Sequence, residues 1–289
     1  MDSFLITSVR VFGGVSVIYE TGHVLFSRGV IMLVSAQPPQ SLPENCTVIS
    51  GAGCTLLPGL IDTHEHVYYE VSGLRNSLSY GVTTVLDLYN ETPWSNNAKR
   101  TARERNGVAD ILSSYKAATI PKGWPEDVFR FLDPSEEVRD WMRHPFSLQL
   151  GKLVLQKERE KDSSVDQSDF SGKREVCFSF IKIVQETGEG FNAFPVGKTL
   201  PSISIQRALV AGAQEHRVLC VAHAMNHGDT FAVLQADVDG VVHALVDKTP
   251  TPKLVKAFKE SGAFLVPTLT VTASKGGGRG EPRQICEGT

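Results

Sequence analysis

The chain has 289 residues, of which 41% are hydrophobic and 21% are charged, and its formal net charge is −3. This composition is that of a globular protein with one large or two ordinary domains, and it offers no basic surface for nucleic acid. No apolar run approaches the roughly 20 residues that cross a bilayer, and the first residues lack the pattern of a secretory signal. Five scattered cysteines without a CxxC pair argue against a zinc-thiolate site. We therefore expect a reduced, cytoplasmic protein that binds neither nucleic acid nor membrane.

Residues 1–55 are predicted to form a small β-domain. Four segments, at 4–12, 15–19, 29–35 and 47–50, are rich in valine, isoleucine and phenylalanine, and glycine, proline and asparagine separate them. No helical period is visible in this part of the chain, so short strands are the expected elements.

From Leu56 onward, apolar segments alternate with segments that can form helices. The predicted strands lie near residues 56, 82, 109, 178, 218, 240 and 263, and the predicted helices cover 74–80, 202–216, 229–236 and 252–260. Strands that alternate with helices in this way predict a parallel α/β sheet or barrel over residues 56–272.

Two stretches depart from this alternation. Residues 115–176 contain a predicted helix at 134–143 and a charged, polar run at 156–175. We interpret them as a solvated insertion, and a lid over an active site is the alternative. From Ala273 the chain is rich in glycine and poor in apolar residues, so residues 273–289 are predicted to be a disordered tail.

Four histidines and one lysine stand at or inside the predicted strands. His64 and His66 are two residues apart, so their side chains point the same way from an extended backbone. Lys182 lies inside an apolar strand, where an unpaired ammonium would be costly, and His223 and His243 end later strands. The C-terminal ends of parallel strands in a barrel meet at one mouth, so these residues predict a metal site. A lone histidine, or a lysine paired with a carboxylate, also has a purely structural explanation.

The segment LPGLIDTHEH at 57–66 strongly resembles the first-strand signature of the amidohydrolase superfamily, in particular its imidazolonepropionase- and prolidase-like members. Weaker similarities to later strands of that family follow in order at 81–87 (GVTTVLD), 180–183 (FIKI), 221–224 (VAHA) and 239–244 (DGVVHA). The resemblance covers about residues 4–272, and only its first motif is specific by itself.

This resemblance implies a TIM-like (β/α) barrel with a small N-terminal β-sandwich portion, and a metal-dependent hydrolase that acts on C–N bonds. His64 and His66 would bind the more buried metal, and Lys182, carboxylated by carbon dioxide, would bridge two metals. His223 and His243 would hold the second metal. Zinc is the expected cofactor, and a hydroxide between the metals would attack a small-molecule amide, peptide or lactone-like substrate. Tyr68 and Tyr69, which follow the first metal pair, are candidates for substrate contact.

One expected feature of such enzymes, an aspartate at the end of the eighth strand, is missing from its place. The acids near the end of the sequence, Glu281 and Glu287, lie in the glycine-rich tail, so no catalytic acid is assignable. The barrel is therefore predicted to be incomplete at its C-terminus. The alternative function is a truncated, catalytically inactive amidohydrolase-like protein, either a non-catalytic binding protein or a damaged gene product. An incomplete barrel would also leave strand edges unpaired, which gives a physical motive for a homo-oligomer.

Overall fold

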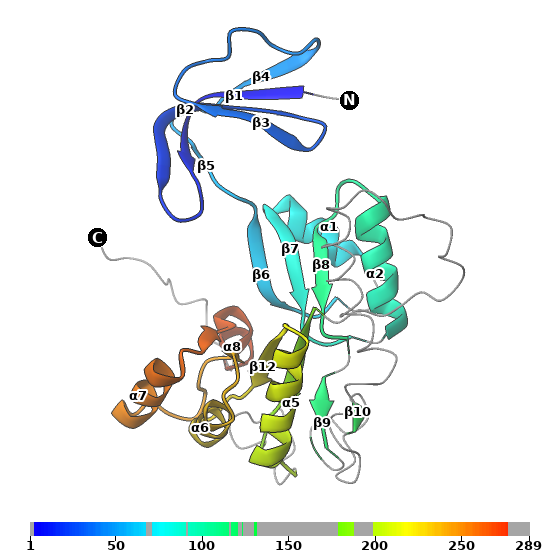
Figure 1. Cartoon of the computed structure of the whole chain (residues 1–289), viewed down its shortest axis with the longest axis vertical. Coiled ribbons are helices and arrows are strands. Elements are labelled where there is room, and N and C mark those ends of the chain that lie inside the picture. Colours follow the sequence, from blue (N-terminus) through cyan, green and yellow to red (C-terminus); the bar gives the residue numbers. More distant parts are fainter. Residues whose placement is uncertain are drawn as a thin grey trace. The chain divides into compact units, whose positions relative to one another are not determined.

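A computed structural model of the chain describes residues 3–67, 71–90, 92–115, 117–120, 123, 130–131, 179–187 and 199–276 (Figure 1). The chain divides into two compact units, Met1–Leu60 and Ile61–Thr289. The helix predicted at 134–143, the charged run at 156–175 and the tail beyond Gly276 lie outside the described residues, so the choice between a solvated insertion and a lid stays open.

The first unit contains one five-stranded sheet. Its strands are β1 (Ser3–Phe12), β2 (Val17–Ser27), β3 (Val30–Ser35), β4 (Cys46–Ser50) and β5 (Thr55–Leu56). The order is β3-β2-β1-β4, and the short β5 also pairs with β1. Valines at positions 9, 11 and 24 form its buried core. The four expected strands are present, although the second extends to Ser27. The described residues of this unit form a single sheet, so the β-sandwich stays a prediction.

The second unit begins with a three-stranded sheet in the order β6-β7-β8. Its elements are β6 (Leu60–Glu65), α1 (Ser72–Ser79), β7 (Val82–Asp87), α2 (Thr92–Glu104) and β8 (Asp110–Ser113). Strands β7 and β8 are parallel. Leu74 of α1 and Ala98 of α2 pack with Val85 and Ile111 of the strands in one buried cluster, so the helices cover this sheet as the alternating pattern predicts.

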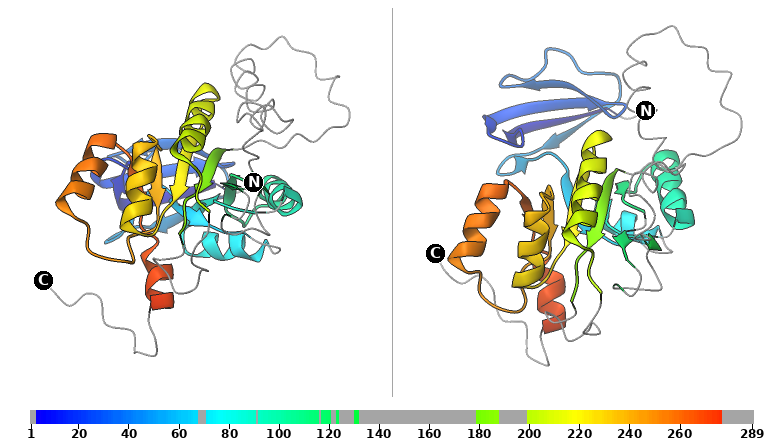
Figure 2. Two further views of the ribbon diagram at one scale, coloured as in Figure 1. Left: turned by 90° about the horizontal axis from the view of Figure 1, so that it is seen from below. Right: turned by 60° about the horizontal axis from the view of Figure 1, so that its bottom comes forward.

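A six-stranded sheet, with every pair parallel, forms the rest of the second unit in the order β10-β9-β11-β12-β13-β14. Its strands are β9 (Ala118–Thr119), β10 (Arg130–Phe131), β11 (Phe180–Val184), β12 (Leu219–His223), β13 (Gly240–Val242) and β14 (Phe264–Val266). Helices α5 (Ile203–Glu215), α6 (His227–Gln235) and α7 (Pro252–Ser261) form a row along one face of this sheet, as Figure 2 shows.

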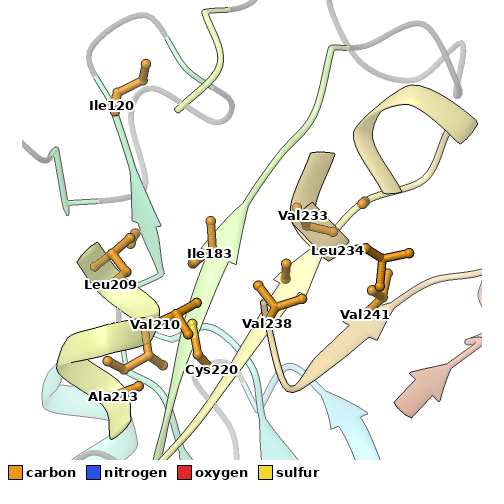
Figure 3. Close-up of a cluster of buried hydrophobic side chains, with 14 of the residues drawn as sticks. Ile120, Ile183, Leu209, Val210, Ala213, Cys220, Val233, Leu234, Val238 and Val241 are labelled. Atoms are coloured by element: carbon orange, nitrogen blue, oxygen red, sulfur yellow. The ribbon is translucent and has the colours of Figure 1, made fainter. Parts of the chain in front are cut away.

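The two faces of the six-stranded sheet carry different side chains because residues alternate along each strand. Ile183 of β11 points to the helices, where it packs with Leu209 of α5 and Val233 of α6 (Figure 3), and Ile181 belongs to the same buried cluster. Phe180 belongs to another cluster, together with Val221, Val242 and Leu88. Lys182 alternates with Ile181 and Ile183, so it lies on the face of Phe180, away from the helices.

The strand expected at 56–62 begins later than the apolar run suggested. Thr55 and Leu56 pair with β1 in the first unit, whereas β6 begins at Leu60 and pairs with β7. Pro58, which lacks a backbone N–H, stands between the two segments. One apolar run is thus shared between two sheets, and His64 lies within β6 rather than after it.

Helix α2 was not expected from the sequence. Its buried side chains are Ser95, Ala98 and Thr101, which recur every three residues but are small or polar. A helix with this kind of buried face lacks the apolar period that identifies amphipathic helices.

Helix α8 (Leu269–Gly276) extends three residues past Ala273, where the sequence predicted the tail to begin. The described fold is therefore a mixed α/β fold with parallel strands, as expected. No helix in the described part of the chain combines the length and the apolar character that membrane crossing requires.

Candidate functional site

Four imidazole rings, from three separate segments of the second unit, lie in a row. The ring centroids of His66 and His64 are 5.1 Å apart, those of His64 and His243 are 4.6 Å apart, and those of His243 and His223 are 4.5 Å apart. The Nε2 atoms of His64 and His66 approach to 3.3 Å. The structure therefore brings together the four histidines that the sequence singled out.

Lys182 lies on β11 with only 4% of its surface exposed. Its Nζ is buried and has no hydrogen-bond partner among the described atoms. Burial lowers the pKa of Lys182 well below its ordinary value, because an ammonium without water or a counter-charge is unstable. Burial therefore disfavours the ammonium form of Lys182.

Burial also lowers the pKa of each of the four histidines. The pKa of His66 falls to about 4, and the positive charge of Lys182 contributes to this shift after burial. Burial is likewise the largest cause of the lowered pKa of His64, His223 and His243, and repulsion from the protonated forms of Lys182 and the neighbouring rings is the smaller cause. All four rings are therefore neutral near pH 7, which is the form of imidazole that binds metal ions.

Three of the four rings have a nitrogen in a hydrogen bond to a group outside the row of rings. The Nδ1 of His66 lies 3.2 Å from the carbonyl oxygen of Tyr89, which can only accept, so Nδ1 carries the proton. The Nδ1 of His243 lies 2.7 Å from the Thr268 hydroxyl, and the Nε2 of His223 lies 2.9 Å from a carboxylate oxygen of Glu186. Such bonds orient imidazoles and select their tautomers in metal sites.

The backbone of His243 has a positive φ of 83°, which is uncommon for a residue with a side chain. The amide of His243 donates to the carbonyl of Val266 at 2.8 Å, and its ring pairs with Thr268, whose φ is also positive, at 46°. Two adjacent turns with uncommon backbone angles thus hold one imidazole in the row. Backbone strain of this kind is concentrated at functional sites in proteins.

The end of β6 is fixed by buried groups at the end of β7. The amide of Val67 donates to Asp87 at 3.2 Å, and the Asn90 side chain donates to the carbonyl of Val67. Asp87 also accepts a hydrogen bond from the Ser113 hydroxyl at 2.9 Å. Burial raises the pKa of Asp87 from 3.8 to about 7, although these hydrogen bonds oppose the shift.

Two groups of this site were missed in the sequence. Glu186 follows β11 by two residues and its side chain is fully buried against His223, and Thr268 follows β14 by two residues. Their position in the sequence could have identified them, because both are polar residues just after the C-terminal end of a parallel strand. Such residues meet at one edge of the sheet. Tyr68 and Tyr69 lie outside the described residues, so their suggested role in substrate binding stays a prediction.

The row of rings does not by itself form a finished metal site. In the part of the chain that the structure describes, no group of three or more His, Cys, Asp or Glu side chains is arranged to hold one ion. Two features nevertheless fit a metal. Two zinc–nitrogen bonds of about 2.0–2.1 Å at a tetrahedral angle separate the nitrogens by about 3.3 Å, which is the spacing of the His64 and His66 Nε2 atoms. The second is the unpartnered Lys182 nitrogen.

Comparison with known proteins identifies relatives by structure only. No protein-family model matches the chain, and no curated protein matches it by sequence. Among solved structures, an amidohydrolase with 22% identity has a TM-score of 0.67, over 98% of this chain and 70% of its own. A Xaa-Pro dipeptidase with methionine bound in its active site has 16% identity and a TM-score of 0.65, over 94% of this chain and 68% of its own.

The ochratoxinase of A. niger is a third structural relative, with 16% identity and a TM-score of 0.67, over 94% of this chain and 66% of its own. At these identities the likeness establishes a common fold. One of these structures is itself named an amidohydrolase, the family whose first-strand signature the segment at 57–66 resembles.

Proposed function

We propose that this protein is a metal-dependent hydrolase that acts on the C–N bond of small amide or peptide-like molecules. The observation that carries the proposal is the row of four neutral imidazoles beside the buried, unpartnered amine of Lys182. The fold resembles those of an amidohydrolase and a Xaa-Pro dipeptidase, and this likeness supports hydrolysis of a C–N bond as the reaction.

The proposal includes a TIM-like arrangement of the strands in the second unit, incomplete over the described residues. Three contacts between its two sheets support this geometry. Leu88, next to β7, packs with Phe180 and Val242 of the other sheet, and the amide of Ser179 donates to the carbonyl of Ser113 at 3.0 Å. The ring of His64 in β6 meets that of His243 after β13. Strands that meet at both sides in this way curve around a common axis.

His64 and His66 would hold one metal ion through their Nε2 atoms. The hydrogen bond from the Nδ1 of His66 to Tyr89 leaves the lone pair of that ring on Nε2, which faces His64. Zinc suits neutral imidazole and carboxylate ligands. When bound, such an ion supplies polarisation of a substrate carbonyl and lowers the pKa of water.

Lys182 would supply an oxygen ligand after carboxylation, and His223 and His243 would hold a second ion. A neutral amine adds carbon dioxide by forming an N–C bond and releasing one proton, which yields an anionic carbamate. The lowered pKa of Lys182 and its unpartnered Nζ favour that reaction. A carbamate facing several neutral imidazoles would also relieve the cost of a buried, unpaired amine.

Metal analysis of the purified full chain, with His64→Ala as the test variant, examines this proposal. We expect bound zinc in the wild type and a loss of at least half of it in the variant. Hydrolysis of N-acyl amino acids and of dipeptides that include Xaa-Pro should require the metal. His216→Ala is the matched control, because His216 caps α5, outside the row of rings. Equal metal content in His64→Ala and the wild type would show that the site is assigned to the wrong residues.

The catalytic acid of such a hydrolase is not identified among the described residues, which leaves a non-catalytic, metal-binding protein as the second candidate. Residues 267–276, which follow β14, contain no aspartate or glutamate. The two candidates differ in one result. Metal binding without hydrolysis of any amide or dipeptide tested would favour the binding protein, and metal-dependent hydrolysis would favour the enzyme.

A further inference from the structure

The segment after β11 is hydrogen-bonded to the segment where β12 ends and α6 begins. Three consecutive residues form these bonds: Gln185, Glu186 and Thr187. The amide of Gln185 donates to the carbonyl of His223 at 3.0 Å. The carboxylate of Glu186 lies 2.9 Å from the Nε2 of the same histidine. The amide of Thr187 donates to Asp229 at 3.1 Å. Glu186 is therefore held between two fixed neighbours.

Asp229 is the common anchor of those neighbours, and only 3% of its surface is exposed. Its Oδ2 accepts hydrogen bonds from the amide and the hydroxyl of Thr187, both at 3.1 Å, and from the side chain of Asn226. Its Oδ1 accepts from the side chain of Gln185 at 3.1 Å. All of these partners donate a hydrogen bond to Asp229. A carboxylate can accept on both of its oxygens, whereas an amide at this position would place an N–H group against some of these donors.

Asn226 completes the network at the start of α6. It is the N-cap of that helix, and its side-chain oxygen accepts from the amide of Asp229 at 2.8 Å. Its side-chain nitrogen donates to the hydroxyl of Thr187 at 2.8 Å. The anchor is thus built on the first turn of α6, and its hydrogen bonds connect that helix to the segment that carries Glu186.

We infer that Glu186 is a positioning residue that selects the Nε2–H tautomer of His223, and that Asp229 holds Glu186 where it can do so. A carboxylate can only accept, and a neutral imidazole has one N–H, so the proton of His223 is directed to Nε2. The lone pair of the ring is then on Nδ1. Only the consequence for metal binding rests on the proposed function, because the tautomer itself is a property of the metal-free protein.

The tautomer can be measured directly in the metal-free full chain, labelled with ¹⁵N in its histidines, by the long-range ¹H–¹⁵N pattern of the His223 ring near pH 7. We expect a single Nε2–H pattern in the wild type. Glu186→Gln keeps an acceptor oxygen and should preserve it, whereas Glu186→Met keeps the volume without an acceptor and should give a mixture of both tautomers. A purely structural side chain would not separate these two variants. An Nδ1–H pattern in the wild type, or the same pattern in Glu186→Met as in the wild type, would overturn the inference.

Asp229→Asn tests the anchor, and Asp237→Asn is its matched control, because Asp237 is exposed just after the other end of α6. An asparagine at 229 brings donor N–H groups toward the donors of Gln185 and Thr187. We expect hydrogen exchange of the Thr187 amide to accelerate at least about tenfold, and the His223 pattern to become mixed. If Asp229→Asn matches Asp237→Asn in both measurements, Asp229 has no part in holding Glu186.

Zinc titration of the same proteins separates this inference from the proposed function. Loss of an outer partner of a histidine ligand commonly costs about 10–100-fold in metal affinity, so we expect a loss in that range for Glu186→Met and a smaller one for Glu186→Gln. If the wild type binds no zinc but shows the Nε2–H pattern, the proposed function fails and the positioning role stands. If zinc binds equally to the wild type and Glu186→Met although their His223 patterns differ, the tautomer role stands and the expected consequence for metal affinity is wrong.

Discussion

The two sides of the candidate site are held in different ways. On the β11–β12 side, all five residues of β11 are buried, and the groups beside Lys182 and His223 are fixed by the side chains of Glu186 and Asp229. On the β6 side, Leu60 and Ile61 are 52% and 60% exposed, and His66 is fixed by a backbone carbonyl. One side therefore depends on core packing and on the side chains of Glu186 and Asp229. The other depends on backbone hydrogen bonds, including those that join Val67 to the buried side chains of Asp87 and Asn90. Substitutions should disturb the two sides unequally.

The largest expected difference concerns stability. Ile183 on β11 has no exposed surface and packs against helix α5, whereas Ile61 on β6 is 60% exposed. Ile183→Ala should lower the free energy of unfolding by about 2–5 kcal/mol, because it leaves a cavity in the core. Ile61→Ala should cost less than about 1 kcal/mol. Urea unfolding of both variants measures the difference, and equal losses would mean that the described exposure of β6 does not hold in solution.

The next difference is between a substitution that should stabilise the metal-free protein and one that should leave its stability nearly unchanged. Lys182→Met removes a buried amine that has no partner, so the metal-free protein should become more stable, by about 1–2 kcal/mol. The same variant should lose bound metal. His64→Ala should also lose metal but change the stability of the metal-free protein by less than about 1 kcal/mol, because His64 is only half-buried. Thermal unfolding with a chelator present gives both values, and a destabilised Lys182→Met would show that the amine is satisfied.

A third difference is a dependence of stability on pH, which arises on the β6 side. The folded protein holds the pKa of Asp87 at about 7 against 3.8, so the folded state binds more protons between these values. The contribution of Asp87 to stability is therefore present near pH 4 and is lost as the pH rises through about 7, with a slope of at most about 1.4 kcal/mol per pH unit. Asp87→Asn should reduce this slope, measured by urea unfolding at pH 5, 6.5 and 8. The exposed Asp237→Asn should not, and an unchanged slope in Asp87→Asn would contradict the shift.

The sequence predicted the parts of this molecule that depend on local pattern. The strands that carry Lys182 and His223 are apolar runs with clear ends, and LPGLIDTHEH is a contiguous motif, so both could be identified from residues near each other in the chain. The path from Leu56 to β6 was misplaced because an apolar run does not reveal which sheet it joins.

The support of the site could not be read in the same way. Glu186 and His223 are 37 positions apart, and the partner of the His66 ring is the backbone of Tyr89, whose side chain plays no part in that bond. The buried face of helix α2 could not be recognised in the sequence, because Ser95 and Thr101 are polar residues of the kind usually found on the surface. Contacts of this kind are consequences of the folded arrangement, and no local period signals them.

The contact between the rings of His64 and His243 has a consequence for the way the protein is made. These residues are 179 positions apart, and His243 is the last of the five candidate ligands to be synthesised. A ribosome extends a chain by about 5–20 residues per second, so the first two histidines are present for roughly 9–36 seconds before their neighbour exists. During that interval, a metal ion captured by His64 and His66 alone would occupy a half-built site. The full set of candidate ligands therefore exists only after His243 has been synthesised.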